Sequence, residues 1–491
     1  MSPQIPDARF RLPHTFVVEP ELAIDEGPAR GVVIGRNNDK APLHAVYLGK
    51  HAETPHRNVW MDVRGAHVLY VMGKRRSGKS YTLGALAEGL VSNAWVKQGT
   101  FNQGVVILDT MNVFLTMPFG VNDTEVSTSP ASQELKKWKI DPEPLPLNLF
   151  APAGSQIPAE LNATTITLRA SDLGVEEWCG LFEVDPFVDP MGHLITLLIS
   201  KITEQGVTDR NSGQYQPPRQ VYTIQDLMAA LDIDPEFDAF ANETRQALRR
   251  RFDALAKTAL FGPAGLDVRS LIRPSQISIL LLRDLDAEMR SVMVSLIVKK
   301  VMELRAISEQ QERLIPIHLA RAEKYASSDP ARADTERHKA DDCAQKANAG
   351  IPRAWLIIDE AHNYIPARSN VPSKKPLKSY VNEGRNLGLS IVVATQQPAG
   401  LDPSIQRNAD LLLVHALSHQ DDIVAAQGML NTSIPDDVTL DGKYKITGNR
   451  TFDAVVRNLP LGYAIAATDR ANRLFPICVR PRATVAGGSD Y

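Results

Sequence analysis

The residues best suited to chemistry form the sequence GKRRSGKS, from Gly73 to Ser80, which has the pattern G-x-x-x-x-G-K-[ST]. Its glycines let successive backbone N–H groups point at one phosphate cluster, and a helix that begins near Gly78 adds its positive dipole end. In this pattern Lys79 reaches the β- and γ-phosphates and Ser80 binds Mg²⁺. The alternative is a surface turn, but the apolar strand before the loop and the amphipathic helix after it favour phosphate binding. We therefore expect ATP and Mg²⁺ here, bound by Gly73, Lys74, Arg75, Arg76, Ser77, Gly78, Lys79, Ser80 and Tyr81.

An acidic pair follows a second apolar run, AWLIIDEAH, in which Asp359 ends the run and Glu360 comes next. A phosphate loop needs an acidic partner on a neighbouring strand, so we expect Asp359 to hold the Mg²⁺ shell and Glu360 to orient or deprotonate the attacking water. An acidic cap on the following turn is the alternative. Two halves of one nucleotide site in a single chain favour the catalytic interpretation. Packing or capping explains His362 at least as well as catalysis does.

A third polar group ends the run IVVATQQP, where Thr395 and Gln396 follow buried strand residues. A neutral amide at the carboxyl end of a strand can contact both the γ-phosphate and the attacking water without adding charge. We therefore expect Gln396 to sense the state of the nucleotide. An ordinary amide at a strand end, with no such role, is the alternative.

Short apolar runs that alternate with helical patterns position these residues. Such runs, bounded by turns, are typical of buried strands in a parallel sheet, so we predict an α/β fold. Five of them are HVLYVM (67–72), GVVILD (104–109), AWLIID (354–359), LSIVVAT (389–395) and DLLLVHAL (410–417). A sixth, ISILLL (277–282), precedes a long helical pattern.

Three other segments have a different character. Several short strands between residues 15 and 63, separated by turn formers, predict a small β-barrel or sheet. Residues 120–275 have Pro-rich connections and helical stretches, which indicates a mainly helical insertion. Residues 303–349 are rich in charge and Ala, which favours a solvated helical excursion or a loop over a binding element.

Composition limits the class of protein. The chain has 491 residues, with 54 Lys plus Arg against 57 Asp plus Glu, so its net charge of −3 argues against a surface that is basic all over. The 3 cysteines are far apart, which makes a disulfide framework or a zinc site unexpected. No stretch of about 18 apolar residues occurs, and the N-terminal sequence lacks the apolar core of a secretory signal. We therefore expect a cytoplasmic protein with no membrane contact.

The motifs resemble those of the HerA branch of the HerA/FtsK superfamily of ring-forming DNA translocases. The resemblance rests on the phosphate loop, the DEAH of 359–362, EGRNLGLSIVVATQQP (383–398) and the closing LPLGYAIAATDRANRLFPICVRPR (459–482). It implies a homo-hexameric ATPase that moves double-stranded DNA through its ring, in company with a nuclease or an antiphage effector. It also implies a RecA-like core, preceded by a small barrel and followed by a segment that braces the neighbouring subunit. The division implied is a barrel (1–62), a core (63–119 and 276–458) that contains the charged excursion (303–349), a helical insertion (120–275) and a brace (459–491).

The chain also departs from the family pattern. Where the family has an Asp-Pro-His-Gly-Glu-Tyr type of sequence, this chain has Asp109-Thr110-Met111-Asn112, so only the aspartate carries over and the glutamate is missing. His415 stands where an Arg is common. Arg385 and Arg407 are the nearest candidates for an arginine that reaches the γ-phosphate of an adjacent subunit, and surface or interface ion pairs are the alternative.

Three competing interpretations remain. DEAH also marks superfamily 2 helicases, but the second domain that those need is not evident. Conjugative coupling proteins share the motor core but carry a membrane anchor. The third alternative is a ring scaffold that binds ATP and gates a partner enzyme with little translocation; the missing glutamate and the altered His415 leave room for it.

Contact with DNA would fall to two basic clusters, KKPLK (374–378) and RQALRRRFDALAK (245–257). A solvated face explains each cluster equally well.

Overall fold

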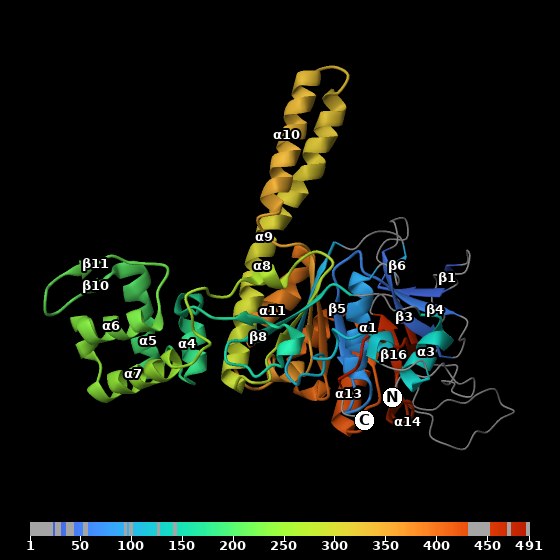
Figure 1. Cartoon of the computed structure of the whole chain (residues 1–491), viewed down its shortest axis with the longest axis horizontal. Helices are drawn as coiled ribbons and strands as arrows, with labels where there is room; N and C mark the ends of the chain where they lie inside the picture. Colours follow the sequence, from blue (N-terminus) through green and yellow to red (C-terminus); the bar gives the residue numbers. More distant parts are fainter. Residues whose placement is uncertain are drawn as a thin grey trace.

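One large mixed sheet organises the chain (Figure 1). The computed structural model describes residues 23–24, 31–35, 44–52, 57–92, 96–97, 102–124, 128–140, 145–430, 452–468 and 473–487. Fifteen of the described strands lie in this sheet, and eight neighbouring ones are all parallel to each other. The expected α/β fold is therefore confirmed, with a mostly parallel sheet at its centre.

The parallel part contains every strand that carries a site motif. In spatial order its strands are β15 (Leu411–Val414), β5 (Val68–Met72), β14 (Leu389–Thr395), β13 (Ala354–Ile358), β7 (Gly104–Asp109), β12 (Ile277–Leu281), β8 (Leu147–Pro152) and β9 (Thr164–Ile166). Residues of β5, β7, β12, β13, β14 and β15 are buried throughout, because helices cover both faces of the sheet. The carboxyl ends of these strands consequently meet at one edge.

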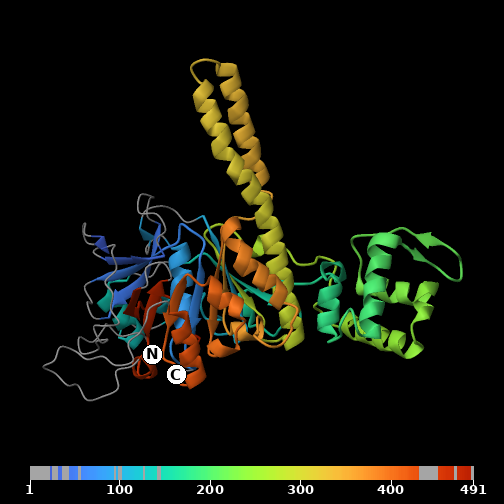
Figure 2. The same cartoon turned by 180° about the vertical axis from the view of Figure 1, so that it is seen from behind.

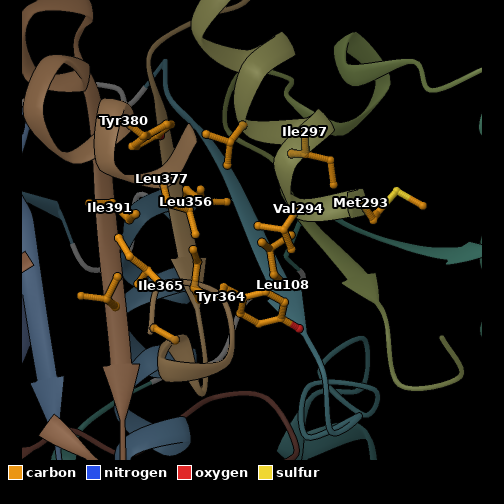
Figure 3. Packing of buried hydrophobic residues seen from close by; sticks show 14 of the residues in the cluster. Leu108, Met293, Val294, Ile297, Leu356, Tyr364, Ile365, Leu377, Tyr380 and Ile391 are labelled. Carbon is orange, nitrogen blue, oxygen red and sulfur yellow. The ribbon is translucent and has the colours of Figure 1, made fainter. Parts of the chain in front are cut away.

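Helices on opposite faces enclose two layers of core. On one face α1 (Lys79–Val91) packs Leu83, Leu86 and Leu90 against the side chains of β5 and β7 that belong to the same buried cluster. On the other face α9 (Ala287–Tyr325) and α11 (Lys374–Glu383) cover the sheet. Figure 3 shows residues of the cluster on this face: Leu108, Leu356 and Ile391 from the strands, with Met293, Val294, Ile297, Leu377 and Tyr380 from the helices.

The remaining, mostly antiparallel part joins the N-terminal strands to the core. Strand β16 (Tyr463–Thr468) pairs with β15, and β17 (Arg473–Val479) pairs with both β16 and β3 (Ala45–His51). The strands beyond β3 are β4 (Asn58–Asp62), β2 (Gly31–Ile34) and β1 (Ala23–Ile24), while β6 (Val96–Lys97) also pairs with β3. The small barrel expected in residues 1–62 is not shown, because the described strands of that stretch belong to the one sheet. The first expected strand, at residues 15–20, lies outside the described residues.

Residues 120–275 contribute both to the sheet and to a separate lobe. Strands β8 and β9 extend the main sheet, so this stretch is less helical than its sequence indicates. The lobe lies at one end of the molecule in both views (Figures 1 and 2). It contains α4 (Val175–Leu181), α5 (Pro190–Ser200), α6 (Ile224–Ile233), α7 (Asn242–Ala256) and the short pair β10 (Val207–Thr208) and β11 (Tyr215–Gln216).

A helical hairpin projects from the body. It consists of the outer half of α9 and the antiparallel helix α10 (Pro330–Ala347), and these helices include most of the charged stretch 303–349 (Figures 1 and 2). Asp286 caps α9 and Asp329 caps α10, each by accepting a backbone N–H of the first turn. The remaining described α-helices are α2 (Val121–Thr124), α3 (Pro130–Trp138), α8 (Val268–Leu271), α12 (Pro403–Asn408), α13 (Gln420–Met429) and α14 (Phe452–Arg457).

None of the helices in the described part of the chain combines the length and the apolarity that a membrane span requires.

Candidate functional site

The phosphate loop connects β5 to α1 at the carboxyl edge of the sheet. Its backbone is anchored to two neighbouring strands, because Gly73 N donates to Thr395 O (3.2 Å) and Lys74 N donates to Ala416 O (2.7 Å). A Cβ at position 73 would lie 2.4 Å from Ser77 Oγ, so only glycine fits there. Gly78 has φ of 101° at the start of α1, a conformation that glycine adopts without strain.

Lys79 and Ser80 open α1 and face the acidic motif. Ser80 Oγ donates to Asp359 Oδ2 (2.7 Å), which joins two residues 279 positions apart in the sequence. Lys79 is 6% exposed, and its ammonium donates to Lys74 O (3.2 Å). Burial lowers the pKa of Lys79, while the carboxylates of Asp359 and Glu360 oppose that shift. Cation, hydroxyl and carboxylate thus converge at one edge.

Glu360 and Gln396 contact each other directly across β13 and β14. Gln396 Nε2 donates to Glu360 Oε1, and Glu360 has φ of 51°, a left-handed conformation in the residue that follows Asp359. Burial raises the pKa of Glu360, and the charge of Asp359 raises it further. His362 Nδ1 lies 3.1 Å from Thr395 Oγ1 and 3.4 Å from Glu360 Oε2, so this ring also joins the acidic motif to the end of β14.

Polar atoms without partners show that these residues suit a phosphate and a cation. Ser77 Oγ and Glu360 Oε2 are buried and have no hydrogen-bond partner among the described residues. Buried polar atoms in this state are costly unless a ligand or water satisfies them. In the part of the chain that the structure describes, no group of three or more His, Cys, Asp or Glu could hold a metal ion alone. A hydroxyl and one carboxylate instead suit Mg²⁺ that is shared with phosphate oxygens.

The loop after β7 explains the departure from the family pattern. Asp109 accepts the backbone N–H groups of Met111, Val113 and Phe114, and burial raises the pKa of Asp109 to about 6. Asn112, at the position of the glycine in the family sequence, has φ of 57°, a left-handed conformation that asparagine adopts more readily than most residues. The aspartate therefore shapes the turn. Val113 stands at the position of the missing glutamate and supplies no catalytic group.

His415 is a neutral, buried residue. Its exposed fraction is 0%, and its Nδ1 lies 2.8 Å from Tyr463 O, a carbonyl that can only accept, so Nδ1 carries the proton. Its Nε2, 3.0 Å from Thr82 Oγ1, then accepts that hydroxyl. Burial lowers the pKa of His415 to about 4. This ring joins α1 to β16 and provides no charge for a neighbouring subunit.

The two arginines that sequence analysis singles out lie at the opposite edge of the sheet. Arg385 Nη2 is 3.1 Å from Asp410 Oδ1, and Asp410 also accepts Val68 N at the start of β5. The phosphate loop follows the other end of β5, roughly 16 Å away for a strand of this length. Arg407 precedes Asn408, whose carbonyl accepts Arg385, and it is exposed with no ion pair among the described residues. Neither side chain joins the site within its own chain.

The remaining residues predicted to bind nucleotide separate into two groups. Lys74, Arg75 and Arg76 are exposed on the loop, and Arg76 has φ of 58°. The hydroxyl of Tyr81 instead accepts Arg482 N (2.7 Å), so this residue is tied to the C-terminal part of the chain. The sequence analysis assigns no role to Thr395, which contacts His362, or to Thr82, which contacts His415. Their hydroxyls, at the end of a motif strand and in the first turn of the motif helix, could have indicated these contacts.

Ion pairs within the chain engage both basic clusters. Lys374 and Lys378 each lie 3.6 Å from Asp402, and Lys375 lies 2.6 Å from Glu176. Along α7 the pairs are Arg245–Asp238, Arg249–Asp232 and Lys257–Asp253. Much of the positive charge in each cluster is therefore balanced before any polyanion approaches.

A strand, a phosphate loop and a helix, with an acidic residue on a parallel strand of the same sheet, define the P-loop class of α/β proteins. Residues 67–301 match the family model for the helicase HerA central domain, so the resemblance indicated by the motifs is confirmed.

Three solved structures are similar to this chain to different degrees. VirB4 of Thermoanaerobacter pseudethanolicus is 14% identical, with a TM-score of 0.50 over 90% of this chain and 97% of that chain. The plasmid coupling protein TrwB, solved with ADP and Mg²⁺, is 14% identical, with a TM-score of 0.45 over 85% of this chain and 86% of that one. The genome packaging NTPase of Sulfolobus turreted icosahedral virus 2, solved with ATP-gammaS, is 8% identical, with a TM-score of 0.30 over 84% and 96%. No curated protein matches the chain.

Proposed function

We propose that this protein is an ATPase of the HerA type that uses ATP hydrolysis to move double-stranded DNA through a homo-hexameric ring. The observation that carries the proposal is the contact of Ser80 with Asp359 beside the pair formed by Glu360 and Gln396. A metal-binding hydroxyl and carboxylate, a general base and a neutral amide are the groups that phosphoanhydride hydrolysis requires. The HerA central-domain match over residues 67–301 supports the same activity.

Each side chain has a distinct part in the proposed reaction. Ser80 and Asp359 would hold Mg²⁺, which with ATP supplies a polarised phosphoanhydride bond. Lys79 and the loop amides bind the phosphates. Glu360 accepts the proton of the water that attacks the γ-phosphorus as the bond to ADP breaks. Gln396, bonded to Glu360, holds the carboxylate in place and reports the change to β14.

The assembly extends the proposal beyond one chain. Residues 63–119 and 276–458 form the motor core, the described strands of 1–62 extend its sheet, 120–275 is the insertion, 303–349 is the excursion and 459–491 is the C-terminal segment. Arg385 or Arg407 from the adjacent subunit stabilises charge on the γ-phosphate. Of the two, Arg407 is favoured, since Arg385 is paired with Asp410. A nuclease or a defence effector in the cytoplasm completes the proposed machinery.

A second function is favoured by specific observations. The ion-paired basic clusters and Val113 in place of the glutamate suit a ring that binds ATP to assemble and gate a partner enzyme, with little translocation. Such a scaffold would need the nucleotide site but no strong contact with DNA.

One experiment separates the two functions. The rate of ATP hydrolysis is measured with and without linear duplex DNA, on protein whose native mass is determined in the same buffer. We expect a hexameric mass and a rate that rises at least severalfold with DNA, while Lys79→Ala lowers nucleotide affinity by about a hundredfold, through loss of a charged phosphate contact. A rate that DNA leaves unchanged favours the scaffold, and equal hydrolysis by wild type and Lys79→Ala contradicts both.

A further inference from the structure

The C-terminal strap, residues 480–487, leaves β17 and crosses the helix of the phosphate loop. Arg480 bonds to both sides of that crossing, because its Nε donates to Tyr47 O on β3 (3.1 Å) and its Nη2 donates to Ala85 O on α1. Tyr81, directly after Ser80, accepts Arg482 N. The strap thus contacts α1 from its first turn to its last.

Glu88 on α1 is the centre of this contact. It is fully buried, and its carboxylate accepts Arg480 Nη1 (2.9 Å), Ala483 N (3.2 Å) and the hydroxyl of Thr484 (2.6 Å). Thr484 Oγ1 in turn accepts Arg482 Nη2 (2.8 Å), so the hydroxyl links the second arginine to the same carboxylate. Two buried guanidinium groups and one carboxylate therefore form a single network with the strap backbone.

The strap also holds the loop that follows β7. Val121 N donates to Ala483 O (2.8 Å), Val485 N donates to Phe119 O (2.9 Å), and Thr116 Oγ1 donates to Val485 O (3.1 Å). This loop begins at the turn that Asp109 shapes, beside the strand that carries Asp359. Two segments that flank the nucleotide site are consequently joined through one tail.

We propose that the C-terminal strap positions α1, and with it Lys79 and Ser80, against the loop after β7, which makes Glu88 and Thr484 positioning residues for nucleotide binding. This inference rests on the proposed function, because it assigns a role in binding ATP and ADP at that site. The bond between Ser80 and Asp359 crosses from α1 to the sheet, so a small shift of α1 separates the groups that bind phosphate and metal. The strap works within its own chain, whereas the family resemblance implies a brace on the neighbouring subunit.

Linkage gives the inference a reciprocal consequence. If the strap favours the arrangement that binds nucleotide, then bound nucleotide stabilises the strap by the same free energy. The backbone N–H groups of Ala483 and Thr484, which donate to Glu88, report that effect through hydrogen exchange. A strap that is uncoupled from the nucleotide site shows no slowing beyond the protection that bound ligand gives to every amide that exchanges by global unfolding.

The test compares ADP·Mg²⁺ affinity across three variants of the full-length protein. Thr484→Val removes the bridging hydroxyl at constant shape and should raise the Kd for ADP·Mg²⁺ about five- to tenfold, the usual size of such couplings. Thr484→Ser keeps the hydroxyl and should restore the wild-type Kd. Thr196→Val is the matched control, since it loses a hydroxyl bond to Gly192 O in α5, away from the site, and should leave the Kd unchanged.

Hydrogen exchange of the wild type provides a second readout that needs no variant. ADP·Mg²⁺ should slow exchange at Ala483 and Thr484 by a similar factor. Equal Kd values for wild type, Thr484→Val and Thr484→Ser, or exchange at the strap that ADP·Mg²⁺ leaves unchanged, would overturn the strap inference alone. Failure of the wild type to bind ADP·Mg²⁺ would overturn both the inference and the proposed function.

Discussion

The two ends of α1 differ in how completely their charges are satisfied. At the first turn Lys79 and Ser80 face the acidic motif, where Ser77 Oγ and Glu360 Oε2 are buried without a hydrogen-bond partner among the described residues. Near the last turn both oxygens of Glu88 accept hydrogen bonds, from Arg480, Ala483 and Thr484. The same helix thus carries one polar cluster that is incomplete and one that is saturated.

The difference separates a binding site from a structural network. Unsatisfied buried atoms are tolerated where a ligand supplies the missing partners, and they cost stability elsewhere. A saturated network leaves no free hydrogen-bond donor or acceptor for a ligand, and its contribution is to fix the position of the helix. Changes at the first end should therefore alter turnover with little effect on stability, whereas changes at the other end should lower stability and, through the position of α1, weaken nucleotide binding.

Glu360→Gln should give the largest effect on activity. The amide keeps the shape of the side chain but cannot accept a proton, so we expect turnover of ATP to fall by at least about a hundredfold, as for loss of a general base. The Kd for nucleotide should stay within about twofold and the unfolding midpoint should not fall, because a buried charge is removed. Steady-state hydrolysis, nucleotide titration and urea unfolding of one preparation measure all three. Full activity in this variant contradicts the role of Glu360.

Arg480→Met should give the largest loss of stability. It leaves Glu88 buried without its main cation, and breaking a buried ion pair costs about 3–5 kcal/mol. The matched control is Lys375→Met, which breaks the exposed pair with Glu176 and should cost less than about 1 kcal/mol. Urea unfolding at fixed pH compares the two variants. Similar losses of unfolding free energy in both variants would show that the strap network stabilises the fold no more than an exposed ion pair does.

The sequence predicts the site because parallel strands bring their carboxyl ends together. Short apolar runs that end in Gly73, Asp359 and Gln396 indicate one edge of one sheet, and the contact of Ser80 with Asp359 lies there. The pairing partners of the outer strands are not predicted, since a short apolar run indicates that a strand is buried but does not indicate which strand lies beside it. For this reason β8 and β9 were not predicted within a stretch expected to be helical. The pairing of β17 with β3, by which the N-terminal strands continue the sheet, was not predicted either.

The strap network was not predictable from local patterns. The residues around Glu88 in α1 are mostly small or apolar. A single acidic residue among them does not indicate a partner nearly 400 positions away in the sequence. Arg385 shows the converse, because its place in a motif-like sequence indicates a functional arginine while the fold pairs it with Asp410. Charge pairing across the sheet is decided by tertiary packing, which no single segment encodes.

His415 joins the first turn of α1 to β16 and should give the smallest effect, visible as a pH dependence. It is neutral in the folded protein, with its pKa lowered to about 4 by burial between Thr82 and Tyr463 O. The unfolded chain binds a proton below about pH 6.5, so stability is lost as pH falls from there toward 4. At pH 5 the loss relative to pH 7 is about 2 kcal/mol.

The variant His415→Asn tests this dependence, because its amide can still donate to Tyr463 O but does not titrate. Between pH 7 and pH 5 the wild type should lose about 2 kcal/mol more unfolding free energy than the variant, since protonation of the histidine is favoured only after unfolding. Urea unfolding at both pH values, without nucleotide, measures the difference. Parallel losses in the two proteins would mean that the ring between α1 and β16 accepts a proton while folded, which contradicts a neutral histidine beside the first turn of α1.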